Sequence, residues 1–282
     1  MTQRNLNMTA VCLITSDNRQ WYIHGNNATN GNKGVFLLEG AKGMDDIIYK
    51  FITSQSARQY GSTYLDRTMD AQEIDLPIMV DGQSTAQMQY RKQEFIKALF
   101  KGEFKLGFFS PLLGWRWMTC RATEVTEVTG NDTNPDRTSF FDVGVTALEP
   151  RPQGWSSRKQ VLLGEATEVT LTNDSDMDSW PVLVFEGAPK QVSSIEVPGF
   201  PEVEIPAITN GLEKVMIHTQ PSKARAVSSM KGILPWTDTA YKRVQLNIPA
   251  GESLTFIVNT KNYRSGVSKV TIFQDNYYNT AY

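Results

Sequence analysis

Residues 70–121 read DAQEIDLPIMVDGQSTAQMQYRKQEFIKALFKGEFKLGFFSPLLGWRWMTCR, and they specify the architecture of the first half of the chain. Apolar and polar residues alternate over 73–80, the pattern of a strand with one buried face. Asp81-Gly82 predicts a turn in which the glycine takes a positive φ. Two more alternating runs, 104–108 and 115–121, predict two further strands. The segment therefore predicts a strand, a helix and two strands, with the helix packed on an otherwise β domain.

Sequence signals bound the helix of this segment at both ends. Ser84 and Gln87 have the spacing of a capping box. Gly102 is expected to end the helix in the left-handed conformation after about Phe100. Lys92 interrupts the apolar stripe and is expected to extend its ammonium group to water. The stripe that should face the sheet consists of Met88, Phe95, Ile96 and Leu99.

Length and composition are those of a globular protein. The chain has 282 residues, enough for two domains, with 40% hydrophobic and 21% charged residues. A formal net charge of −2 gives no reason to expect nucleic acid or an anionic membrane as a partner. No apolar run reaches the length of a membrane span, and the N-terminal residues lack the apolar core of a signal peptide. Cys12 and Cys120 are expected to be buried thiols in a reducing cytoplasm rather than a disulfide.

Elsewhere in the first half, short strands and two long polar segments are expected. Residues 25–32 are rich in Asn and Gly and predict an exposed loop. Residues 53–70 are polar and predict a long loop or an extended hairpin. Because loops of this length are usually functional, Tyr60, Tyr64 and Arg67 of this segment are candidate contact residues. The expected strands are a hairpin within 10–24, a strand at 35–38, and a pair at 122–129 and 140–148.

Residues 149–154 form the best domain boundary, because two prolines and a glycine there are expected to disrupt a strand ladder. The expected domains are therefore 1–150 and 151–282. Past the boundary, short strand-like runs recur between turns and no long helical pattern is present, which predicts an all-β sandwich. These runs are 169–172, 182–185, 192–197, 203–205, 215–218, 243–248, 254–259 and 269–274.

No residue pattern in the sequence points to catalysis, and no cofactor is expected. His24 and His218 are the only histidines, and neither has a metal-ligand partner at the right spacing. Asp174, Asp176 and Asp178 resemble the start of a calcium loop. An EF-hand is excluded, because the loop lacks its glycine and its final glutamate. A looser calcium site and a solvated turn are both left open.

The run 228–231 matches S-x-x-K and the run 16–18 matches S-D-N, but their order is reversed relative to penicillin-binding enzymes and K-T-G is missing. We interpret this match as coincidence. Trp115 and Trp117 are expected to fill one face of a sheet. The remaining candidates for a binding surface are aromatic residues near loops, Trp155, Trp180 and Trp236.

Several short motifs keep the same order over nearly the whole chain. The first half has an alternating strand with a D-G turn, a helix with Tyr90-Arg91, then Gly107-Phe108-Phe109 and Gly114-Trp115-Arg116. The second half has 171–173 followed by 180–187, then 217–221 and 248–254. With these motifs the chain resembles the distal tail proteins of siphophages, the phages with long non-contractile tails. It departs from the family pattern at His218, where the family has Asp, and at Ser253, where the family has Asn.

The resemblance implies a first domain that forms a six-fold ring under the tail tube and a second, galectin-like β-sandwich domain facing outward. In such a ring the segment 53–70 would reach a neighbouring copy, with Tyr60, Tyr64 and Arg67 as the expected contact residues between subunits. It implies a structural hub at the tail tip or baseplate that joins the tube protein to tip proteins and can carry receptor-binding proteins. The protein would be assembled in the host cytoplasm and would reside in the virion, without catalysis, metal or cofactor. The alternative is a carbohydrate-binding module that attaches the particle to host glycans, and an enzyme is the third interpretation.

Overall fold

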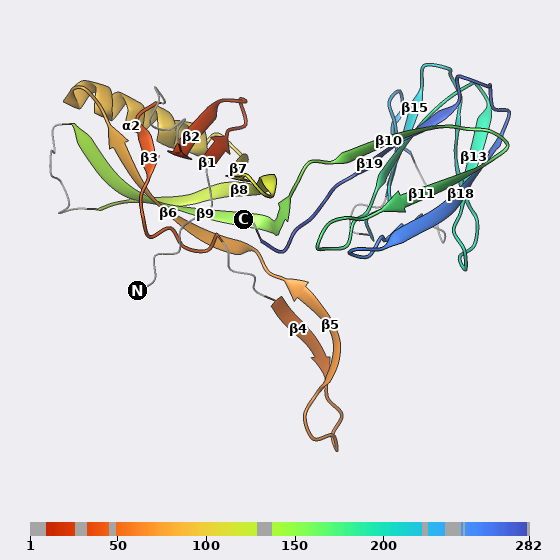
Figure 1. The fold of residues 1–282 in the computed structure, drawn as a ribbon, viewed down its shortest axis with the longest axis horizontal. Coiled ribbons are helices and arrows are strands. Elements are labelled where there is room, and N and C mark those ends of the chain that lie inside the picture. Colours follow the sequence, from red (N-terminus) through yellow and green to blue (C-terminus); the bar gives the residue numbers. More distant parts are fainter. Residues whose placement is uncertain are drawn as a thin grey trace. The chain divides into compact units, whose positions relative to one another are not determined.

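The structure, a computed structural model, describes residues 10–25, 33–44, 49–128, 137–221, 225–234, 244 and 246–280. The chain divides into two compact units, and Figure 1 labels their elements where there is room. Unit 1 comprises Met1–Gly154 together with Asn279–Tyr282, and unit 2 comprises Trp155–Tyr278. Each unit has a hydrophobic core of its own. The loop expected at 25–32 lies, apart from Gly25, outside the described residues.

Unit 1 is built on a seven-stranded antiparallel sheet that is nearly closed into a barrel, because its two end strands approach each other. The expectation of a mostly β chain whose first domain carries a packed helix is confirmed by the described elements. In spatial order the strands are β2 (Gln20–Gly25), β1 (Ala10–Ile14), β7 (Phe104–Ser110), β8 (Gly114–Glu127), β9 (Thr138–Gln153), β6 (Gln72–Asp81) and β3 (Val35–Leu37).

The alternation in β6 buries one face of that strand, as the sequence predicts. Its four inward residues, Ile74, Leu76, Ile78 and Val80, are each at most 1% exposed. Helix α2 (Thr85–Leu99) follows at once, and the Gln87 backbone N–H donates to the Ser84 hydroxyl at 3.3 Å. The return bond of the capping box differs from the prediction, because the amide oxygen of Gln87 accepts from the backbone N–H of Gln83 rather than that of Ser84.

Neither glycine beside α2 has the positive φ that the sequence predicts. Gly82 is needed for close packing instead, because a Cβ there would lie 2.5 Å from the backbone nitrogen of Met88. A Cβ on Gly102 would meet only Ser16, at an ordinary 3.6 Å. The helix ends at Phe100, whose φ of −84° is right-handed. The predicted left-handed cap at Gly102 is therefore wrong.

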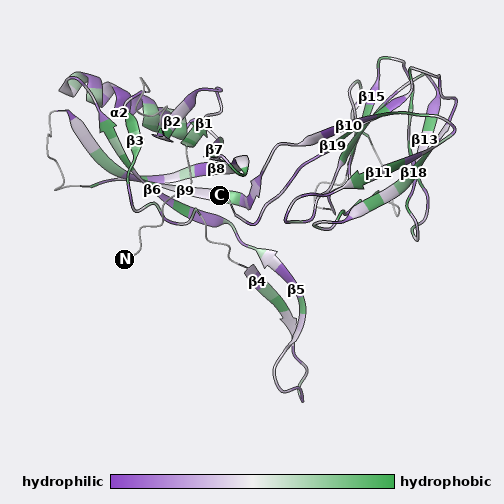
Figure 2. Cartoon of the chain, viewed as in Figure 1, coloured by the Kyte–Doolittle hydropathy of each residue, from purple (hydrophilic) through white to green (hydrophobic). Residues whose placement is uncertain are grey.

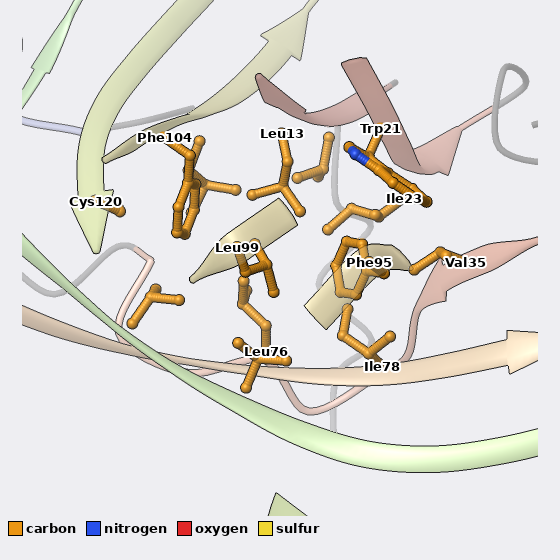
Figure 3. Packing of buried hydrophobic residues seen from close by; sticks show 14 of the residues in the cluster. Leu13, Trp21, Ile23, Val35, Leu76, Ile78, Phe95, Leu99, Phe104 and Cys120 are labelled. Carbon is orange, nitrogen blue, oxygen red and sulfur yellow. The ribbon is translucent and has the colours of Figure 1, made fainter. Parts of the chain in front are cut away.

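The apolar stripe of α2 fills the barrel (Figure 3). Met88, Phe95 and Leu99 are at most 6% exposed, and Ile96 packs at the edge of the same core. Figure 3 shows Phe95 among side chains from several strands and Leu99 above Leu76. Burying each large apolar side chain contributes about 1.5–3 kcal/mol before entropy is subtracted. The stripe is the part of the helix that the sequence predicts best.

Lys92 is partly exposed, and its ammonium group is paired with other side chains. Its ammonium group lies 2.7 Å from the Glu127 carboxylate and donates to the Ser139 hydroxyl at 3.0 Å. The group also lies 5.5 Å from the ring centroid of Phe141. The lysine interrupts the apolar stripe because it links α2 to the two long strands β8 and β9.

The runs predicted as separate strands at 115–121 and 122–129 belong to one strand, β8, which pairs with both β7 and β9. Its partner β9 extends to Gln153, so the prolines at 150 and 152 do not end the ladder. The register shifts there, since Trp117 pairs with Gln153 and Thr119 with Glu149. The prolines thus lie in a bulged stretch, where a strand tolerates residues that lack an N–H donor.

Unit 2 is a two-sheet β structure with residues of both sheets in one core, as expected for a sandwich. One sheet has the order β10 (Ser157–Leu162), β19 (Lys269–Gln274), β12 (Val182–Glu186), β15 (Lys214–His218), β16 (Arg225–Ser228) and β17 (Gly232–Leu234). The other has the order β11 (Ala166–Thr172), β18 (Ser253–Lys261), β13 (Gln191–Glu196) and β14 (Val203–Ile208).

Unit 2 departs from the sequence prediction at several strands. No strand is assigned to the described residues of 243–248, where Ile248 forms a single bridge to Ser179. Strands β10, β16 and β17 were not predicted. β10 is largely exposed and polar, so it lacks the alternation that marks a strand with one buried face.

Cys12 and Cys120 are free and buried, which confirms the prediction of two thiols. Burial raises the pKa of Cys12 to about 11 and that of Cys120 to about 12. Both thiols are therefore protonated and unreactive at neutral pH. Among the described residues, no helix is long and apolar enough to cross a membrane.

Candidate assembly interface

Two strands of unit 1 stand apart from its barrel. Among the described strands, β4 (Tyr49–Ser54) and β5 (Thr63–Met69) pair only with each other. We call this two-stranded sheet, together with the loop that joins its strands, the arm (Figure 1). The pairing runs from Tyr49 opposite Met69 to Ser54 opposite Thr63, with an irregularity between Ile52 and Thr53. Of the two alternatives for 53–70, the structure has the extended hairpin, and it begins earlier than expected, at Tyr49.

The arm exposes apolar side chains on a polar scaffold. Phe51 is 66% exposed, Leu65 58% and Tyr64 56%. The rings of Phe51 and Tyr64 meet edge to face, with centroids 5.8 Å apart. Figure 2 shows the hydrophobic residues within β4. An isolated two-stranded hairpin is marginally stable in water, so an arm of this composition is suited to packing against another surface.

All three predicted contact residues lie on the arm. Tyr60 is fully exposed in the loop that joins β4 to β5, and Tyr64 pairs with Thr53 in the ladder. The Arg67 guanidinium lies 4.4 Å from the ring centroid of Tyr49. Their contact with a second copy stays a prediction. The exposed Phe51, Ile52 and Leu65 are not among the residues that the sequence predicts. Phe51 and Ile52 lie before residue 53, where the predicted segment begins, and Leu65 lies within that segment in β5.

A second cluster of aromatic residues lies on the outer face of the barrel. Trp115 and Trp117 stack with centroids 4.8 Å apart and planes at 8°, as expected for residues filling one face. The ring centroid of Trp115 lies 5.3 Å from that of Phe109 and 6.4 Å from that of Tyr22. Gly107 makes room for this layer, because a Cβ there would lie 2.3 Å from the Trp117 ring. These side chains cover one another, so the arm is the more open surface.

The tryptophans predicted for a binding surface are only partly brought together. Trp155 is 70% exposed, Trp180 is half-buried, and Trp236 lies outside the described residues. Ser156 and Ser179, the neighbours of the first two, both donate to Asp275, at 2.6 and 2.7 Å. Of the two tryptophans that the structure describes here, Trp155 is the more exposed.

The S-x-x-K match lies at the β16–β17 turn and surrounds a buried carboxylate. The Glu213 side chain is 1% exposed and accepts from the Ser228 hydroxyl at 2.5 Å. Thr209 donates to it through both its N–H and its hydroxyl at 2.7 Å, and Lys231 lies 3.6 Å away. Burial would raise the pKa of Glu213, but these hydrogen bonds and the lysine charge lower it to about 2. The cluster holds an ionised carboxylate that closes the turn, which is a structural role.

No group of three or more His, Cys, Asp or Glu side chains that could hold a metal occurs in the described part of the chain. In the loop that resembles a calcium site, Asp178 instead accepts from the Asn247 amide at 3.1 Å. The amide nitrogen of Asn173 donates to the carbonyls of Met177 and Ile248 at 2.8 and 2.9 Å. Hydrogen bonds from the protein itself thus order this loop.

Residues 29–150 match the family described as the phage tail protein RIFT-related domain. The match contains the arm and most of the barrel, and it confirms the resemblance to siphophage tail proteins. No curated protein sequence matches the chain.

Solved structures of phage proteins share the fold over nearly the whole chain. The Dit protein of phage SPP1, described as a paradigm of the hub adsorption apparatus in phages that infect Gram-positive bacteria, has a TM-score of 0.63 at 11% identity, covering 94% of this chain and 98% of that one. A chain of the phage P2 baseplate in its activated conformation with Ca has a TM-score of 0.55 at 11% identity, covering 94% and 97%. At 11% sequence identity, these similarities show a shared fold.

Proposed function

Residues 29–150 are a phage tail protein RIFT-related domain, and from this premise we propose that the chain is a structural hub of a siphophage distal tail. In this role it joins the tail tube protein to the tip or baseplate proteins. The arm is the observation that carries the proposal, because it lies within the matched domain and exposes Phe51, Tyr64 and Leu65. The named hub and baseplate proteins with the same fold support it.

The mechanism we propose is ring closure by heterologous contacts. A closed ring requires each copy to present one surface to the next copy and a different surface to the previous one. The arm supplies one of the two surfaces, with Tyr60, Tyr64 and Arg67 among its contacts. Aromatic and arginine side chains suit this use, since they are enriched where interfaces gain most of their binding energy. Six copies form the ring, in the proposed hexamer.

The two expected domains have different roles in this proposal. Residues 1–150 form the ring, and residues 151–282 face outward and carry tip or receptor-binding proteins. The chain acts in the tail of the virion after assembly in the host cytoplasm, without catalysis or cofactor. The carbohydrate-binding alternative is less well supported, because of its three tryptophans only Trp155 is exposed among the described residues.

Mass measurement of the purified full-length chain tests the proposal. Light scattering over a concentration series, with and without the tail tube protein, should detect a six-fold ring. The double substitution Phe51→Ser with Leu65→Ser removes apolar contacts from the arm and should reduce the ring population at least tenfold, as loss of interface anchors does. Tyr90→Ser is the matched control, because Tyr90 is 65% exposed but lies on α2.

Two outcomes would contradict the proposal. One is a monomer at every concentration, even with the tube protein present. The other is a ring whose population is unchanged by the arm substitutions. Circular dichroism of each variant shows whether the chain is still folded.

A further inference from the structure

The segment that follows unit 2 in the sequence belongs structurally to unit 1. Asn279–Tyr282 is grouped with the barrel, although 124 residues of unit 2, Trp155–Tyr278, precede it in the chain. Arg116 of β8 is only 5% exposed and donates through Nη1 to the Thr280 carbonyl at 2.7 Å. The same nitrogen lies 3.4 Å from the Thr280 hydroxyl. A largely buried guanidinium thus holds residue 280 by a charge-assisted hydrogen bond, which is stronger than a neutral one.

The neighbouring residue contacts the base of the arm. The Tyr49 hydroxyl donates to the Asn279 amide oxygen at 3.1 Å. Tyr49 is the first residue of β4, opposite Met69, the last residue of β5. The guanidinium of Arg67 lies 4.4 Å from the Tyr49 ring centroid, so the tyrosine joins both strands of the arm to residue 279.

Within the described part of the chain, few other interactions could fix the direction of the arm. Its strands pair only with each other, and apart from Tyr49 and Met69 their residues are exposed. Lys50 and Asp70 form an ion pair at 2.7 Å, but the pair is exposed to solvent and therefore contributes little to stability. A two-stranded element without a core depends on what is attached to its base.

We infer that Asn279 and Thr280 are positioning residues for the arm. Arg116 fixes this segment to the barrel, and Asn279 holds Tyr49 and with it the base of the arm. The consequence of this inference rests on the proposed function. Ring contacts made by the arm then depend on Asn279, which is 230 positions from Tyr49 in the sequence, and on its neighbour Thr280. A purely structural role would make the segment affect the stability of unit 1 without changing the motion of the arm.

A double-mutant cycle on the full-length chain separates these roles. Tyr49→Phe removes the hydroxyl and keeps the ring beneath Arg67, and Asn279→Ala removes its acceptor. Trypsin reports on the arm, because Arg58 and Arg67 are exposed there. Each single substitution should speed cleavage at these arginines about fivefold, the effect of one hydrogen bond on a local opening equilibrium. The double variant should be no faster than either single one, because both remove the same bond.

Arg116→Met extends the cycle, and Tyr263→Phe is the control. Arg116→Met should give the largest increase in the rate of trypsin cleavage of the arm, about tenfold, because it removes a charge-assisted hydrogen bond. Tyr263 lies in unit 2, is 44% exposed, and its variant should match the wild-type cleavage rate. If Arg116→Met fails to fold, the Tyr49 and Asn279 variants still decide the question, because they leave the barrel untouched.

Every result either supports or overturns the inference. Faster cleavage of the arm with a non-additive cycle and an unchanged melting temperature of unit 1 supports it, and the ring population should then fall in the same variants. Unchanged cleavage, or additive effects, overturns it even if the wild-type ring forms. If the wild type forms no ring, the proposed function fails, while the cleavage rates of the monomer still decide whether Asn279 and Thr280 position the arm.

Discussion

The ring of Phe95 lies edge-on to that of Trp21, with centroids 5.2 Å apart and planes at 70°. Trp21 belongs to β2 and Phe95 to α2, so the contact ties the helix to one end strand of the barrel. Phe141 of β9 lies on Phe95 as well, with centroids 6.4 Å apart. One aromatic side chain of the helix thus joins two strands that are distant in the order of the sheet.

Replacing Phe95 with Ala should destabilise unit 1 by about 3–5 kcal/mol, because the side chain is 1% exposed and its loss leaves a cavity in a closed core. Denaturant unfolding followed by tryptophan fluorescence and circular dichroism measures the change. Tyr90→Ala, on the exposed side of the same helix, should change the free energy of unfolding by less than about 0.5 kcal/mol. A loss below about 1 kcal/mol for Phe95→Ala would show that the helix is peripheral.

Gly82→Ala and Gly102→Ala should have opposite outcomes. At Gly82 the new methyl group would lie 2.5 Å from backbone of α2, so the start of the helix must shift, at about 1–3 kcal/mol. At Gly102 its nearest neighbour is 3.6 Å away and φ is not positive, so alanine should be neutral or slightly stabilising. Thermal unfolding of both variants measures this. An equal loss of thermal stability in both variants would mean that each glycine is required for its backbone conformation.

The sequence predicts the barrel better than the arm, and burial is the reason. Ile74, Leu76, Ile78 and Val80 alternate because one face of β6 meets the core, and alternation is what sequence analysis detects. The arm has no buried face, so its strands leave no such pattern. Its polar residues and tyrosines predict an exposed segment but do not mark Phe51 and Leu65 as exposed apolar residues.

Contacts between residues distant in the sequence could not be predicted either. Lys92 faces Glu127 and Ser139, which are 35 and 47 positions away. The same holds for the role of Gly82, since the atoms it must avoid belong to the next element rather than to its own turn. For the candidate interface, the sequence supplied the segment and three of its residues, and the fold supplied its shape and its anchorage.

Acid should destabilise unit 2 through Glu213. Its pKa is lowered from 4.5 to about 2, so its contribution is complete above pH ~5 and is lost as the pH falls towards 2. The contribution is on the order of 3 kcal/mol. Unfolding of Glu213→Gln and wild type between pH 7 and pH 2 should show a stability difference that shrinks over this range. Glu204→Gln, at an exposed position of β14, is the control. A difference that is constant with pH would contradict the assignment.

Limited chymotrypsin digestion should cut the chain after Trp155, which is 70% exposed and follows the end of β9. Residues 149–153 should resist, because they are paired or half-buried in the extended strand. Mass spectrometry of the first fragments identifies the site. If the first cleavage sites lie inside unit 1 or unit 2 and none lies near Trp155, the prediction is contradicted.

The Arg116–Thr280 hydrogen bond also has a consequence for the order in which the protein matures. Its partners are 164 positions apart, so at translation rates of ~5–20 residues per second a ribosome makes Arg116 on the order of ten seconds before Thr280. All strands of the barrel precede unit 2 in the chain, and the barrel can form during that interval. The anchorage of the arm cannot form until unit 2 has been synthesised. Nascent chains that still lack residue 280 therefore have an arm without this anchorage, and in the proposed ring the arm contacts would follow the synthesis of unit 2.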